Sequence, residues 1–88
     1  MTEVMNTLYQ FIQEYRIGPL IQGSRDYREY CRCGRIQEDR LRAMLDEKGT
    51  ETLESMLQEL SNQHCEELIA MFRATMALCR ELNGDFLL

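Results

Sequence analysis

Apolar residues recur at intervals of three or four through most of this 88-residue chain, and that interval marks one face of an α-helix. Over residues 3–16 the repeating positions are Val4, Leu8, Phe11 and Tyr15. Gly18 and Pro19 come next, and proline disfavours helical geometry in its predecessor and has no backbone N–H to donate. The pattern therefore predicts a helix over residues 3–16 and an irregular stretch over residues 18–24.

A second amphipathic segment begins after Ser24, a residue type that caps helix N-termini well, and continues to about Lys48. Its apolar side comprises Tyr27, Tyr30, Cys31, Gly34, Leu41, Met44 and Leu45. Gly49 is the residue type that most often ends a helix in a left-handed conformation, and Thr50 can cap the next helix. We therefore predict a helix over residues 24–48, followed by a tight antiparallel turn.

The third segment, residues 51–83, has the longest helical pattern. Its main apolar stripe is formed by Leu53, Leu57, Leu60, His64, Leu68, Phe72, Thr75, Cys79 and Leu82. In the stretch LIAMFRATMALC only Arg73 and Thr75 are polar, so a second side of this helix is apolar as well. A helix with two apolar sides needs two packing partners.

Together these segments predict an all-α fold, in which a single domain of residues 1–88 contains a short N-terminal helix and a long antiparallel helical hairpin. A chain of this length buries only ~60–65% of its unfolded surface, so association with a second chain is a natural supplement. We predict a homodimer with a four-helix core, because two-fold pairing is the commonest assembly of small proteins. The predicted dimer contact consists of Ile69, Ala70, Phe72, Ala74, Thr75, Met76 and Ala77.

Positive charge is concentrated in one short part of an otherwise acidic chain. The formal net charge is −5, yet residues 24–42 contain six arginines. At about 100° per residue, five of them share one arc of the predicted helix, beside its apolar side. This row, which we call the arginine ridge, consists of Arg25, Arg28, Arg32, Arg35 and Arg42.

The ridge has two interpretations, and the first is structural. Carboxylates three or four residues away neutralise the guanidinium groups, through pairs that are each worth only ~0.2–0.5 kcal/mol. The available pairs are Glu29 with Arg32, Asp39 with Arg35 or Arg42, and Glu38 with Arg42.

In the second interpretation the ridge binds an anion. Guanidinium groups hold phosphates and carboxylates through paired donors, and they stack on aromatic rings. Neither a helix-turn-helix spacing nor an aromatic RNA-binding motif accompanies the ridge, which favours an acidic host protein or an anionic small molecule over nucleic acid. The predicted ligand- or partner-binding residues are Arg28, Arg32, Arg35, Tyr27 and Tyr30.

The sequence contains no recognisable catalytic or metal-binding motif. Cys31 and Cys33 lie about 200° apart on a helix, whereas metal ligands on a helix are usually four residues apart, so we predict neither a metal site nor a cofactor. His64 lies in an apolar stripe, and the sequence offers it no nucleophile or phosphate-binding loop. We therefore predict a protein that is not an enzyme.

Hydropathy also bears on location. No apolar run approaches the ~20 residues that a membrane span needs. The N-terminal sequence MTEVMNTLYQ lacks the basic and apolar regions of a secretory signal. We therefore expect a cytoplasmic protein with reduced cysteines and no membrane partner.

Several short motifs resemble a family of uncharacterised helical proteins found in Firmicutes and their phages and mobile elements. The matching motifs are Leu8-Tyr9, Pro19, Tyr27-Arg28-Glu29, and Phe72-Arg73 with Leu78 and Glu81. The chain differs from that family in a longer segment between Tyr9 and Pro19, and in Thr75, where the family often has glycine. The resemblance implies the helical fold and a bacterial or phage setting, and it implies no activity.

Three functions fit these features. The first is a binding protein, such as a phage or mobile-element accessory that blocks or sequesters a host protein or an anionic ligand. The second is a DNA- or RNA-binding regulator that contacts phosphates through the arginine ridge. The third is a structural subunit whose only function is to assemble with itself or with a larger complex.

Overall fold

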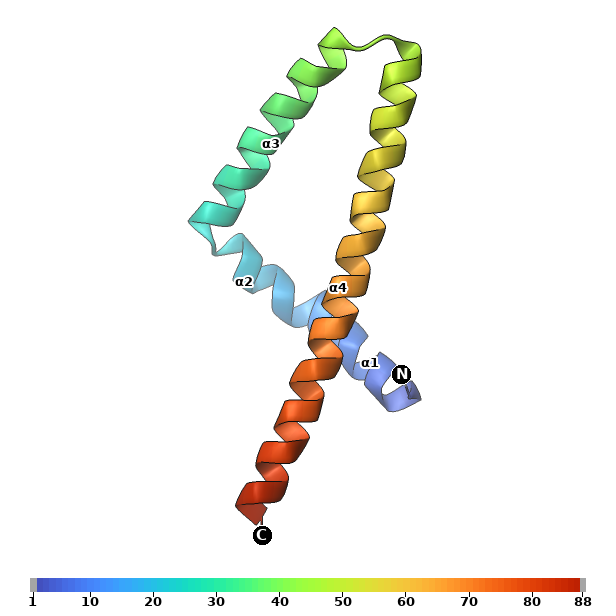
Figure 1. Ribbon diagram of the computed structural model, residues 1–88. Coiled ribbons are helices and arrows are strands. Elements are labelled where there is room, and N and C mark those ends of the chain that lie inside the picture. The colour runs from blue at the N-terminus through green and yellow to red at the C-terminus, as the bar shows by residue number, and fades with distance from the viewer. Residues whose placement is uncertain (1, 88) are drawn as a thin grey trace. The chain divides into compact units, whose positions relative to one another are not determined.

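A computed structural model describes the backbone of residues 2–87 and the side chains of residues 2–84 (Figure 1). Within residues 2–87 every regular element is helical and no strand occurs, so the predicted all-α class is confirmed. The elements in chain order are α1 (Glu3–Phe11), the π-helical segment η1 (Ile12–Ile17), α2 (Gly18–Gln22), α3 (Arg25–Met44) and α4 (Glu47–Leu87).

The chain divides into two units, Met1–Leu53 and Glu54–Leu88, and each is described by itself. The first unit contains α1, η1, α2, α3 and the first turns of α4. The second unit is the remainder of α4, which is a single continuous helix.

Local capping explains where α1 and α3 begin. The hydroxyl of Thr2 accepts a hydrogen bond from the backbone N–H of Met5 at 3.2 Å, and Ser24 does the same for Tyr27 at 3.2 Å. Both capping residues have extended backbone, which sets them apart from the helices that follow. The predicted N-cap at Ser24 is therefore confirmed.

The prediction that Gly18 and Pro19 end the first helix is wrong. The backbone stays helical from Glu3 to Gln22, because η1 widens the turns and Pro19 falls in the first turn of α2, where a proline N–H is not needed. Residues 18–22 are consequently helical and not irregular. The interruption lies at Gly23 and Ser24 instead.

The connection between α3 and α4 also differs from the prediction. Helix α3 ends at Met44, and Leu45 is extended, with φ −100° and ψ 147°. The carboxylate of Asp46 then accepts a hydrogen bond from the N–H of Gly49 at 2.7 Å, which caps α4 from the position before its first residue. Gly49 therefore lies inside the first turn of α4, and no described glycine has a positive φ.

Few apolar side chains are buried in the single chain. Among the described side chains only Leu53 and Phe72 are buried apolar residues, with 7% and 8% of their surfaces exposed. The large apolar residues that remain exposed include Val4, Leu8, Phe11, Leu20, Ile36, Leu41, Met44, Met56, Leu60, Met71, Leu78 and Leu82. Within residues 2–87 no helix combines the length and the hydropathy needed to cross a membrane.

Candidate binding surface

The predicted binding residues all lie on α3, and all five are exposed. Tyr27 and Tyr30 expose 49% and 75% of their surfaces, so both rings are available for stacking. Arg28, Arg32 and Arg35 are also exposed. The three guanidinium groups nevertheless have different surroundings, and these differences decide what the ridge can bind.

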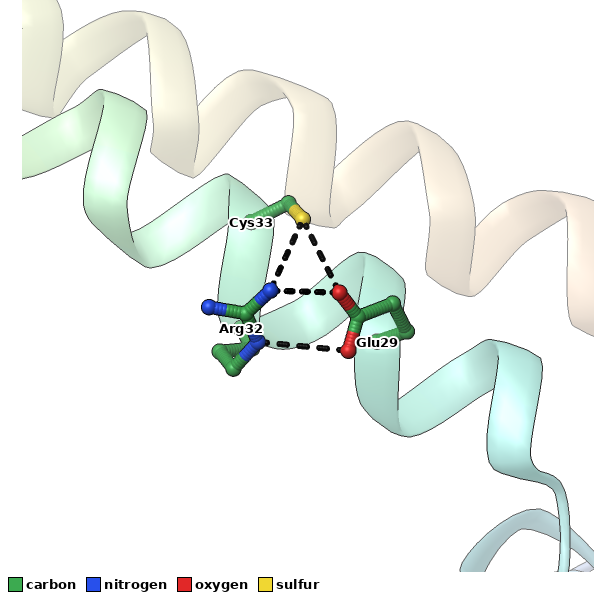
Figure 2. A network of polar contacts seen from close by, with 3 residues as sticks. All are labelled: Glu29, Arg32 and Cys33. Carbon is green, nitrogen blue, oxygen red and sulfur yellow. Dashed lines mark hydrogen bonds and ion pairs between the residues drawn. The ribbon is translucent and has the colours of Figure 1, made fainter.

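Arg32 forms an ion pair with Glu29, one turn earlier on α3 (Figure 2). Its Nη2 donates to Glu29 Oε1 at 2.5 Å and its Nε donates to Glu29 Oε2 at 3.2 Å. This bidentate geometry is the preferred arrangement of a guanidinium and a carboxylate. The predicted pair is therefore confirmed. Glu29 occupies one bidentate edge of the guanidinium and neutralises its charge, while the Nη1 donors of Arg32 have no partner among the described residues.

The ion pair shifts the protonation of both partners. The hydrogen bond from Arg32 lowers the pKa of Glu29 below its usual range, and the positive charge of Arg32 acts in the same direction. Reciprocally, the hydrogen bond to Glu29 raises the pKa of Arg32. Glu29 therefore stays ionised to a lower pH than an isolated glutamate does.

Cys33 completes this cluster on α3. Its thiol donates to Glu29 Oε1 at 3.6 Å, and Nη2 of Arg32 lies 3.9 Å from its sulfur (Figure 2). Sulfur contacts of this length are weak, so Cys33 orients the carboxylate without contributing much energy. The sequence analysis missed this role, although the spacing of four residues between Glu29 and Cys33 places them on one helix face.

Arg28 has a different partner. Its Nη1 donates to the backbone carbonyl of Gln22, the last residue of α2. Carbonyl groups at a helix C-terminus have no partner within their own helix, so this bond satisfies one of them. Arg28 thus links α3 to the end of α2.

The other charged residues of the ridge divide into paired and unpaired groups. Arg42 pairs with Glu38 at 3.0 Å and is only 32% exposed in its side chain, as predicted for that pair. Asp39 pairs with neither Arg35 nor Arg42 in the described structure. Arg25 and Arg35 have no hydrogen-bond or ion-pair partner among the described residues, so they are the unoccupied cations of the ridge.

Tyr27 faces Cys31 one turn later along α3. A hydrogen bond with the Cys31 side chain raises the pKa of Tyr27, and the electrostatic interaction with Cys31 acts in the same direction. The phenol therefore remains protonated at neutral pH and can donate a hydrogen bond.

The structure separates the predicted dimer residues into two groups along α4. Phe72 is buried at 8% exposure, and Ile69 and Met76 are half-buried. The other four are exposed in the single chain, namely Ala70, Ala74, Thr75 and Ala77.

The cysteines and His64 form no further cluster in the described part of the chain. No three His, Cys, Asp or Glu side chains gather there in a way that could hold a metal ion. All four cysteines are free thiols; Cys33 is half-buried and the others are exposed.

Comparison of the chain with models of protein families, with curated proteins and with solved structures finds no match. The resemblance to the helical family of Firmicutes and their phages therefore stays a prediction.

Proposed function

We propose that this protein is a non-enzymatic binding protein that acts as a homodimer and presents the arginine ridge of α3 to an acidic partner. One observation carries the proposal. Among the described side chains only Leu53 and Phe72 are buried apolar residues, while large apolar residues along α1, α3 and α4 stay exposed. Because burial of apolar surface is the main driving force of folding and association, such a chain is stabilised by contact with another chain.

The ridge supplies the contact for the partner in this proposal. Arg35 is an exposed guanidinium without a described intramolecular partner, and Tyr30 is 75% exposed on the same helix. Paired guanidinium donors suit the carboxylates of a host protein. In the dimer, α3 (Arg25–Met44) and α4 (Glu47–Leu87) form the arms of the antiparallel hairpin, and the setting is a bacterial or phage cytoplasm.

The test is the mass of the particle in solution when the exposed side of α4 is altered. Ala74→Arg places a charge among the predicted contact residues, so the dimer is expected to dissociate. The matched control is Asn6→Arg, at an exposed polar position of α1. Light scattering should give a dimer mass for the wild type and for the control, and a monomer mass for Ala74→Arg. A monomeric wild type at high micromolar concentration would refute the proposal.

A further inference from the structure

One side of α4 carries several exposed apolar residues in the second unit. Leu60, Met71 and Leu78 expose 49%, 68% and 54% of their surfaces. The small residues of this side are exposed too, namely Ala70, Ala74 and Ala77. Gln63, Glu67 and Glu81 fall on the same side, so polar side chains interrupt the apolar surface, and the charged residues beside it carry the argument for a partner.

A row of four charged residues borders this apolar side. Glu59, Glu66, Arg73 and Arg80 follow one another at intervals of seven residues. Seven residues make slightly less than two helical turns, so the four side chains lie in one row along α4. The first two are acidic and the last two are basic, and all four are exposed.

None of these charges can be neutralised within its own helix. The residues three and four positions before and after each of them are uncharged, so no intrahelical pair of the usual spacing is available. In the part of the chain that the structure describes, none of the four forms an ion pair or a side-chain hydrogen bond. Any ion-pair partner of these four side chains must therefore come from outside α4 of the same chain.

The row has a symmetry that identifies the partner. Arg73 lies as far after the midpoint between residues 69 and 70 as Glu66 lies before it, and Arg80 and Glu59 are related in the same way. We propose that two copies of this chain pair through this side of α4 in antiparallel orientation. Glu66 then faces Arg73 of the second copy, and Glu59 faces Arg80 of the second copy. The inference rests on the proposed homodimer and adds its contact surface, orientation and register.

The register also fixes which other positions meet. Residues whose numbers add up to 139 are level with each other, so Ala70 of one copy is level with Ile69 of the other. A small residue against a large one lets the two helices approach closely. Ala77, Arg80 and Glu81 line a shallow hollow on the surface of α4. The same approach brings Glu59 beside Arg80.

The alternative orientation lacks these advantages. In a parallel pair, residues of the same number lie at the same height along the two helices. Each glutamate of the row would then be level with the same glutamate of the second copy, and each arginine with the same arginine. Like charges at equivalent heights disfavour that pairing. A two-fold antiparallel pair instead forms each of the two contacts twice, because the same surface serves both copies.

Reversal of charge tests the pairing. Glu59→Arg/Glu66→Arg makes the row entirely basic, and Arg73→Glu/Arg80→Glu makes it entirely acidic. Each double variant should form homodimers at least about tenfold more weakly than the wild type, because like charges then face each other. An equimolar mixture of the two should form a heterodimer, and the fourfold reversal should restore the homodimer. The control is Glu3→Arg/Glu14→Arg, which changes the same charge on α1 and η1 and should leave dimerisation unchanged.

Spin labels on native cysteines test the orientation. Cys65 and Cys79 are both exposed, and each is labelled alone in protein whose other three cysteines are serine. At 1.5 Å per residue, an antiparallel pair separates the two Cys79 positions by about 28 Å along the axis and the two Cys65 positions by about 14 Å. A parallel pair gives equal distances at the two sites.

The outcomes distinguish this inference from the proposal on which it rests. A monomeric wild type overturns both. A dimer whose stability does not respond to either charge reversal, or whose two label distances are equal, overturns the antiparallel pairing and leaves the homodimer intact. Heterodimer formation together with the longer distance at Cys79 supports the pairing.

Discussion

The guanidinium of Arg32 holds the carboxylate of Glu29 through two hydrogen bonds, at 2.5 and 3.2 Å, on the exposed surface of α3. This contact converts one cation of the arginine ridge into half of a neutral pair. Because Arg28 also has an intramolecular acceptor, Arg35 is the arginine of the predicted binding set whose donors are all free of intramolecular contacts.

The pKa of Glu29 reports this pair directly. The pKa is lowered in the folded protein, so the pair contributes its stabilisation above the ordinary glutamate pKa of about 4.3 and loses it as the pH falls through the lowered value. Arg32→Gln should raise the pKa of Glu29 towards its ordinary range. A carbon-13 NMR titration of the Glu29 carboxyl measures both values, and identical values in the variant and the wild type would contradict the bidentate pair.

Loss of two ridge arginines should weaken anion binding without unfolding the protein. Charge-assisted contacts are worth ~1.5–3 kcal/mol each, so Arg32→Ala/Arg35→Ala should reduce the affinity for inorganic pyrophosphate at least about tenfold. Calorimetric titration measures the affinity, and thermal unfolding should change little because the ridge is exposed.

The matched control for the ridge is Arg40→Ala, which removes an exposed arginine from another side of α3. It should leave pyrophosphate affinity close to that of the wild type. The control removes one charge and the double variant removes two, so a control that loses half as much binding free energy as the double variant would show that the net charge of the protein, and not the ridge, determines binding. A collapse of the melting temperature in the double variant would show that the ridge is a structural network.

Two substitutions of Asp46, the N-cap residue of α4, separate the effect of its charge from the effect of its hydrogen bond. Asp46→Ala removes the acceptor of the Gly49 N–H and should destabilise the fold by about 0.5–2 kcal/mol. Asp46→Asn retains a side-chain acceptor and should stay closer to the wild type. Urea unfolding measures both, and equal destabilisation by the two variants would assign the effect to the charge of Asp46 at the helix N-terminus.

Replacement by alanine should affect the stability differently at two helical glycines. A Cβ at Gly34 meets nothing within 4 Å, so Gly34→Ala should stabilise α3 by about 0.5–1 kcal/mol. A Cβ at Gly49 would lie 3.1 Å from Asp46 Oδ1 and 3.1 Å from Leu45 Cδ2. This crowding offsets the stability that alanine otherwise adds to a helix. Gly49→Ala should therefore stabilise less or destabilise. Equal stabilisation in urea unfolding would contradict the close packing at the start of α4.

Much of the fold follows from local sequence patterns. The apolar periodicity predicted the helical class, and the side chain of Ser24 identified the start of α3. The residues around Pro19 were mispredicted because proline is acceptable in the first turn of a helix, and a preceding π-helical segment supplies that turn without a break. Gly49 was mispredicted because Asp46 offers a stronger N-cap three residues earlier.

The sequence predicted the two ion pairs of the candidate site, but it did not predict the hydrogen bond between α3 and α2. The spacing of Glu29 from Arg32 and of Glu38 from Arg42 predicted both ion pairs, since residues three or four apart are neighbours on a helix. The bond from Arg28 to the carbonyl of Gln22 depends on the angle between α2 and α3, which periodicity does not contain.

The central claim is that the apolar faces of this chain are covered by a second copy, and thermal unfolding at different concentrations tests it most directly. A dimer that dissociates on unfolding has a melting temperature that rises with protein concentration. Circular dichroism at 222 nm follows the helices over a hundredfold range of concentration. The account predicts a melting temperature that increases steadily over this range, and a melting temperature independent of concentration would contradict it.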